Sequence, residues 1–243
     1  MSVDERMVHD IVQKVMANMQ ISGSVSGMHG VFKDMNDAIN ASIEAQKKVC
    51  TMTLDQREQI ISLIRKKTHE NAEILANMGV NETGMGNVGD KILKHHLTAD
   101  KVPGTEDIST IAWSGDRGLT LVEMGPFGVI GAITPATNPS ETVICNCIGM
   151  LAGGNTVVFN PHPNAKKTTI YTINMINEAS IEAGGPDNIA VTVEAPTLDT
   201  SAIMMKHPSI HLLVATGGPG VVTAVLSSGK RAIGAGAGNP PVF

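Results

Sequence analysis

Residues 129–159 decide the fold, reading VIGAIT (129–134), PATN (135–138), a stretch from Pro139 to Ala152, GGN (153–155) and TVVF (156–159). Short apolar runs bounded by Gly, Pro and Asn are typical of buried strands. The stretch between them begins with a proline and ends before two glycines, as helices often do. Strand, helix and strand in this order predict a parallel pair joined by a crossover helix.

The same alternation continues to residue 235. The apolar runs predict five strands, at 129–134, 156–159, 189–193, 210–215 and 231–235, and helices at 139–152, 164–183, 198–205 and 219–228. The expected fold is therefore α/β, a parallel five-stranded sheet with helices packed on it and right-handed crossovers.

The upstream half is expected to be helical, followed by a β-hairpin. Helices are predicted at 31–48, at 53–79, where Thr53 and Gln56 form a capping-box pattern, and at 87–101. Alternating residues at 108–124 predict a hairpin, which needs a partner to cover its edges.

The first twenty residues predict a separate amphipathic helix. Val8, Ile11, Val12, Val15 and Met19 follow helical spacing, and a Ser/Gly-rich linker comes next, at 21–30. Such a stripe suits a partner's hydrophobic groove. The alternative is that it packs on its own domain or on a sister subunit.

Composition excludes several classes of protein. The net charge of −5 and the lack of a basic cluster argue against nucleic-acid binding, and no stretch is long and apolar enough to cross a membrane. Three cysteines make an odd number, so a reduced, cytoplasmic compartment is expected rather than a disulfide framework.

Polar and glycine-rich loops follow the predicted strands. They are 134–138, 160–163, 194–196, 216–220 and 236–239. Ligands of parallel sheets bind at the carboxyl ends of the strands, so these loops form the candidate site. TGGPG at 216–220 could admit a phosphate to helix N–H groups or be only a tight turn. GAGAG at 234–238 is followed by Asn-Pro-Pro rather than a helix, so it is not a dinucleotide fingerprint.

Single residues in these loops leave alternatives open. Asn138 could donate to an oxyanion, but spacing favours a helix N-cap. His162 suits ligand contact and loop packing equally.

His95 and His96 are expected at the surface or against the hairpin. Cys145 and Cys147 are expected to be buried structural thiols that cannot share a metal.

Three segments together resemble the aldehyde dehydrogenase superfamily: GPFGVI (125–130), TPATNP (134–139) and GGNTVVFNPHP (153–163). Within it, the chain resembles the CoA-acylating enzymes of bacterial microcompartments that oxidise acetaldehyde or propionaldehyde. The resemblance implies a nucleotide-binding domain at 31–243 with an oligomerisation hairpin at 106–124. It also implies that the catalytic domain, with the nucleophilic cysteine, is absent and that the chain is truncated.

The resemblance implies roles for residues and partners. Asn138 would hold the oxyanion. Cofactor contacts would come from Thr134, Pro135, Ala136, Thr137, Asn160, His162, Thr216, Gly217, Gly218 and Gly236. Gly234 stands where hydrolytic relatives carry a water-activating Glu, which favours transfer of the acyl group to CoA.

The implied cofactors are NAD and coenzyme A, and the implied substrate is a short-chain aldehyde. A homo-oligomer is expected, located in a microcompartment lumen, with residues 1–20 binding a shell protein. No nucleic acid or membrane partner is expected. The rival interpretation is a non-catalytic nucleotide-binding module or scaffold fragment, and the 243 residues alone are expected to be inactive.

Overall fold

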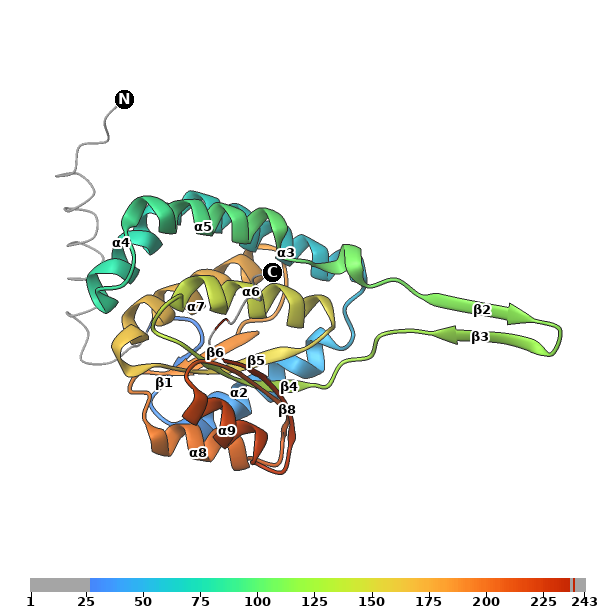
Figure 1. Ribbon diagram of the computed structural model, residues 1–243. Helices are drawn as coiled ribbons and strands as arrows, with labels where there is room; N and C mark the ends of the chain where they lie inside the picture. The colour runs from blue at the N-terminus through green and yellow to red at the C-terminus, as the bar shows by residue number, and fades with distance from the viewer. Residues whose placement is uncertain (1–26, 237, 239–243) are drawn as a thin grey trace, which may run out of the picture.

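The computed structural model describes residues 27–236 and residue 238. Its centre is a parallel sheet in the order β1-β6-β5-β4-β7-β8 (Figure 1). The strands are β1 (Val31–Phe32), β4 (Val129–Thr134), β5 (Thr156–Pro161), β6 (Ala190–Val193), β7 (Ile210–Thr216) and β8 (Arg231–Ala235). The predicted helix at 1–20 and most of the predicted linker lie outside the described residues.

The sheet has six strands, so the prediction of five was wrong by one. The additional strand is β1, which pairs with Thr192 and Val193 of β6 at one edge. A helix was expected from Val31, but α2 (Met35–Val49) begins after Asp34, whose carboxylate accepts from the N–H groups of Asn36 and Asp37. A strand of two residues is too short to show an alternating pattern, so only its pairing reveals it.

Helices cover both faces of the sheet. One face carries α3 (Leu54–Glu70), α6 (Pro139–Ala152) and α7 (Lys166–Glu182), with the fully buried Phe159 in their shared core. The other face carries α2, α8 (Leu198–Lys206) and α9 (Pro219–Leu226), packed on Val158 and Leu213. Burial on both faces explains why these strands are nearly continuous apolar runs.

The helix predicted at 53–79 is two helices. The capping box of Thr53 and Gln56 is present, and α3 ends at Glu70. Asn71 interrupts the chain before α4 (Ala72–Thr83), and its side-chain amide donates to the carbonyl oxygen of Lys67. The apolar pattern continues across Asn71, so periodicity alone did not reveal the break. The next helix, α5 (Val88–Lys101), matches its prediction closely.

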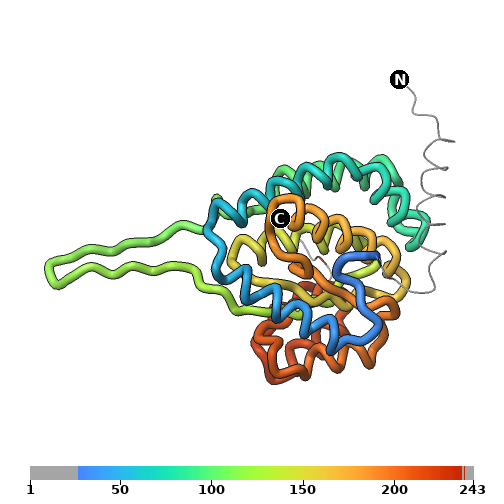
Figure 2. Tube along the Cα trace, turned by 180° about the vertical axis from the view of Figure 1, so that it is seen from behind, coloured from blue at the N-terminus to red at the C-terminus, as the bar shows by residue number. Residues whose placement is uncertain are grey.

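The predicted hairpin is present and projects from the domain (Figures 1 and 2). It consists of β2 (Ile111–Gly115) and β3 (Gly118–Val122), joined antiparallel, with every residue exposed. Two short 3₁₀ helices complete the described elements, at Thr105–Asp107 and Pro163–Ala165.

Candidate functional site

The strand order reverses beside β4. From β4 the chain continues to β5 and β6 on one side, whereas β7 and β8 lie on the other side. Ligands of open parallel sheets bind at the carboxyl ends of the strands, where the order reverses. The candidate site is therefore formed by the loop after β4, which contains Asn138, and the loop after β7, which contains Gly217 and Gly218.

The loop after β4 is held at its base. The N–H of His162 donates to the carbonyl oxygen of Thr134 (3.0 Å), which ties the ends of β4 and β5 together. The Thr134 hydroxyl is buried and has no hydrogen-bond partner among the described residues. Pro135 is partly exposed and Ala136 is buried, while Thr137 faces solvent. Thr134 is only 2% exposed, so its hydroxyl contacts no ligand in this conformation of the loop.

Asn138 occupies the N-cap position of α6, yet its side chain makes no capping hydrogen bond. Its amide oxygen accepts instead from Nζ of Lys94 on α5, at 3.2 Å. The capping role that spacing favours is therefore not the one this side chain has in the structure.

A buried polar cluster anchors the same loop to α5. Lys91 Nζ lies 2.9 Å from the carbonyl oxygen of Thr137 and 3.4 Å from Oε1 of Glu141. The Lys91 and Glu141 side chains are only 4% and 7% exposed, so both charges are shielded from water. Because a buried charge without a partner is strongly destabilising, loss of either Lys91 or Glu141 would leave the other as a costly unpaired charge.

His95 completes this cluster, and its expected surface position was wrong. It is fully buried, with Nδ1 2.6 Å from the carbonyl oxygen of Lys91 and Nε2 2.7 Å from the hydroxyl of Ser140. A carbonyl only accepts, so Nδ1 carries a proton. The Ser140 hydroxyl also lies 3.2 Å from Oε2 of Glu141, and its one proton can serve either Nε2 of His95 or that carboxylate. Burial lowers the pKa of His95, an effect that the carboxylate of Glu141 opposes. The pair resembles a nucleophile and base, but Ser140 is 1% exposed and inaccessible to substrate.

Sequence reasoning did not single out Lys91, Lys94, Ser140 or Glu141. The available signal was the helix at 88–101, which places two lysines three residues apart on one side. Which element that side contacts depends on tertiary packing.

The backbone conformation of the loop after β7 could be adopted by residues other than glycine. Gly217, Gly218 and Gly220 all have ordinary φ values, and an added Cβ at each would meet open space. The N–H of Gly217 donates to the carbonyl oxygen of Ala235 (3.1 Å), and Thr216 pairs with the same residue. The Gly217 N–H is thereby engaged, whereas Gly218, the N-cap residue of α9, has no side chain to hinder the approach of a phosphate to the helix N-terminus. Gly236 follows β8 and is exposed.

Gly234 lies in β8 against α9. A Cβ added there would lie 2.7 Å from Cγ1 of Val222, a stiff β-branched side chain. A larger residue at 234 therefore requires Val222 to move.

The two predicted residues after β5 differ in accessibility. Asn160 is buried, and its amide is engaged by the N-terminus of α8. Its Nδ2 donates to the carbonyl oxygen of Thr197 (3.3 Å), and its Oδ1 accepts from the hydroxyl of Thr200 (2.7 Å). His162 is exposed, and its Nδ1 accepts from the N–H of Asn164 (3.2 Å). His162 is therefore the more accessible of the two residues and the better placed for ligand contact.

Two of the three cysteines are not activated nucleophiles. Burial raises the pKa of Cys145 and of the fully buried Cys147, which suppresses the reactive thiolate. Cys50 is exposed and away from the sheet edge, in the turn after α2. Within residues 27–236 and 238, no group of His, Cys, Asp and Glu side chains could hold a metal ion.

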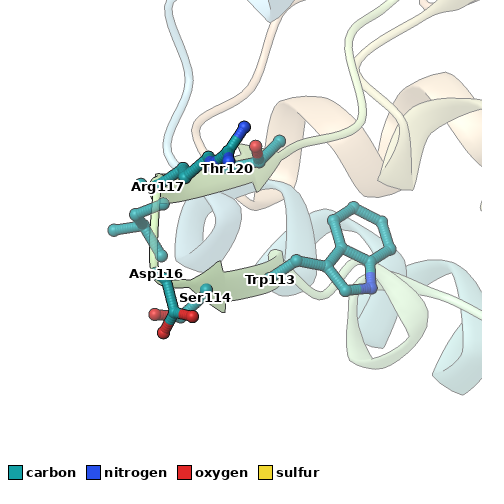
Figure 3. Close-up of a pocket in the computed structure, with 8 residues that line it drawn as sticks. Trp113, Ser114, Asp116, Arg117 and Thr120 are labelled. Atoms are coloured by element: carbon teal, nitrogen blue, oxygen red, sulfur yellow. The ribbon is translucent and has the colours of Figure 1, made fainter.

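A hollow at the hairpin tip is not a second site. All eight of its lining residues, from Trp113 to Thr120, belong to one hairpin, and Figure 3 shows Asp116 and Arg117 at the turn. A two-stranded ribbon with no second element against it cannot enclose a ligand.

The aldehyde dehydrogenase family model matches residues 17–236. The chain belongs to the aldehyde dehydrogenase family. An acetaldehyde dehydrogenase (acetylating) of Bilophila wadsworthia is 46% identical over 98% of this chain and 51% of its own length. The similarity to this acetylating relative confirms the resemblance to CoA-acylating aldehyde dehydrogenases.

Two solved structures have the same fold as this chain. A propionaldehyde dehydrogenase from the Clostridium phytofermentans fucose utilisation bacterial microcompartment is 74% identical, with a TM-score of 0.86 over 88% of this chain and 49% of its own. A Rhodopseudomonas palustris propionaldehyde dehydrogenase with bound propionyl-CoA is 48% identical, with a TM-score of 0.85 over 91% of this chain and 50% of its own. The chain therefore spans about half the length of these relatives.

Within the described residues, no helix is long and apolar enough to span a bilayer.

Proposed function

We propose that the protein carrying this chain is a CoA-acylating aldehyde dehydrogenase, which oxidises a short-chain aldehyde such as propionaldehyde or acetaldehyde to an acyl-CoA. Relatives of this activity, at 46% identity for the acetylating enzyme, support the reaction class. The observation that carries the choice of acyl acceptor is the crowding at Gly234. Hydrolytic relatives carry a general-base Glu there, and here Val222 occupies the space that its Cβ would need.

These 243 residues would supply the dinucleotide and CoA site and one oxyanion donor. NAD, when bound, accepts the hydride of the aldehyde. The backbone at Gly218, the N-cap residue of α9, carries no side chain and suits a phosphate-bearing ligand. Thr134 and Gly217 would lie in the same rim. Pro135, Ala136, Thr137, Thr216 and Gly236 would complete the rim. Asn160 is engaged elsewhere, so its cofactor role requires its two hydrogen bonds to rearrange.

Asn138 is proposed to donate its amide N–H to the oxyanion of the tetrahedral intermediate. Its side chain lies at the loop after β4 and is not committed to capping α6. Preorganised donors of this kind stabilise developing negative charge. The nucleophile must come from elsewhere in the protein, because Cys50, Cys145 and Cys147 do not suit it. The 243 residues alone are therefore expected to be inactive.

The test uses the complete protein with propionaldehyde and NAD. NADH should form when CoA is added and remain near background with water as the only acceptor. Equal NADH formation with and without CoA would contradict acyl transfer to CoA. Repeating the assay with NADP in place of NAD tests the cofactor.

The hairpin is proposed as an oligomerisation element of this protein. Leu119 and Leu121 lie on one face of the ribbon and are 65% and 61% exposed, and Trp113 on the opposite face is 57% exposed. Apolar ribbons of this exposure need a covering surface. Light scattering should show an oligomer that L119E/L121E disrupts, whereas an unchanged mass would refute the assignment.

A location in a microcompartment lumen is also proposed, with residues 1–20 as the segment that binds a shell protein. A 74%-identical relative comes from such a compartment. Fusing residues 1–20 to a fluorescent protein in cells that make the shell should give puncta. Puncta should disappear with I11E/V15E, and diffuse fluorescence of the unchanged fusion would contradict the proposal.

A further inference from the structure

Helix α5 contacts the loop after β4 at two consecutive residues. Lys91 donates to the backbone carbonyl of Thr137 at 2.9 Å, and Lys94 donates to the side-chain oxygen of Asn138 at 3.2 Å. The two lysines are three residues apart, so they lie on the same side of the helix. One anchors the backbone immediately before Asn138, and the other contacts the amide itself.

The Lys94 contact determines which way the amide faces. An ammonium group has three donors and no acceptor, so the atom of Asn138 that faces it must be the oxygen. The NH₂ group then points away from Lys94. An Asn at this position ordinarily turns its oxygen toward the first N–H groups of the helix. Lys94 holds that oxygen, and the capping bond is absent.

We propose that Lys94 is a positioning residue for Asn138: it holds the amide oxygen away from the α6 N-terminus and presents the NH₂ group to the oxyanion. This inference rests on the proposed function, in which Asn138 is the oxyanion donor. A cationic donor on the oxygen also polarises the amide, which strengthens its N–H groups as donors.

A merely structural role for Lys94 predicts different behaviour. Lys94 is exposed, and the buried attachment of α5 to the loop is made by Lys91 with Glu141. Truncating Lys94 therefore leaves that attachment intact. It also frees the Asn138 oxygen to cap α6, so Lys94→Met should not lower the melting temperature.

The experiment compares five forms of the complete enzyme with the unchanged one: Lys94→Met, Lys94→Arg, Asn138→Ala, the Lys94→Met/Asn138→Ala double variant and Lys101→Met. Lys101 is an exposed lysine at the end of the same helix and is the matched control for charge. Initial rates of CoA-dependent NADH formation give kcat and KM, and thermal melting gives stability.

Removing an oxyanion donor lowers kcat about 10²- to 10³-fold, which is the loss expected for Asn138→Ala. Lys94→Met leaves the Asn138 donor in place but less well oriented, so it should lower kcat only about fivefold, with little change in KM. Lys94→Arg should recover most of the loss, and Lys101→Met should match the unchanged enzyme. In the Asn138→Ala background, Lys94→Met should have no further effect, because the residue through which it acts is missing.

A crystal structure of the Lys94→Met enzyme gives a readout that does not depend on activity. The Asn138 amide should rotate toward the first turn of α6 or occupy two orientations. An unchanged amide orientation overturns the inference, as does an equal kcat loss from Lys94→Met with and without Asn138. Failure of the proposed function is distinguishable, since the unchanged enzyme would then make no CoA-dependent NADH or Asn138→Ala would retain full kcat.

Discussion

Replacing Gly30 with alanine should destabilise the protein far more than a surface glycine substitution does. Gly30 precedes β1 with φ of +77°, a conformation that L residues rarely adopt. An added Cβ would lie 2.3 Å from Nδ2 of Asn177 and 2.4 Å from the carbonyl oxygen of Ala190. Those two atoms form a buried hydrogen bond of 2.7 Å, so the new methyl group must separate them or displace β1.

The expected cost is the sum of three effects. The left-handed backbone costs a non-glycine residue about 1–2 kcal/mol. Overpacking a filled interior costs about 1–3 kcal/mol. Loss of the Asn177 hydrogen bond costs about 1 kcal/mol more, so the free energy of unfolding should fall by about 3–6 kcal/mol in all.

Gly84 provides the matched control. It also has a positive φ, +67°, at the end of α4, but an added Cβ there meets nothing within 4 Å. Gly84→Ala should cost only the backbone strain, about 1–2 kcal/mol. Urea unfolding followed by circular dichroism measures both variants. Equal losses for Gly30→Ala and Gly84→Ala would refute the close approach of β1 to α7.

Three further predictions concern buried groups. Glu141→Gln leaves the charge of Lys91 uncompensated and should lower the free energy of unfolding in urea by about 3–5 kcal/mol. The double variant K91M/E141L should lose much less than the two single changes combined. Additive losses would show that Lys91 and Glu141 do not interact. Because burial lowers the pKa of His95, the unfolded chain binds the extra proton, so stability should fall as pH drops below about 6.5, the unfolded value. His95→Gln should flatten this part of the stability curve, and an unchanged slope would assign it to other groups. Of Cys50, Cys145 and Cys147, only the exposed Cys50 should react quickly with a thiol reagent in the native protein; Cys147 should react only after unfolding, and a fast phase that survives Cys50→Ser would count against this order.

Local pattern alone determined most of the elements between residues 129 and 235. Each strand is an apolar run with turn residues at its ends, and each helix carries its own start and stop signals, so neighbouring residues contain the information. The hairpin, the capping box at Thr53 and the polar composition of the strand-end loops were predictable for the same reason. The family resemblance added the expected roles of those loops.

Tertiary structure decided what depends on residues distant in sequence. The place of β4 beside both β5 and β7, which sets where the strand order reverses, depends on strand pairing and not on any local pattern. The two-residue β1 exists only through its bonds to β6. Asn138 also shows the difference between what local sequence predicts and what tertiary contacts decide. Its sequence neighbours predict a helix cap, but Lys94, forty-four residues earlier, takes its oxygen once α5 packs beside α6.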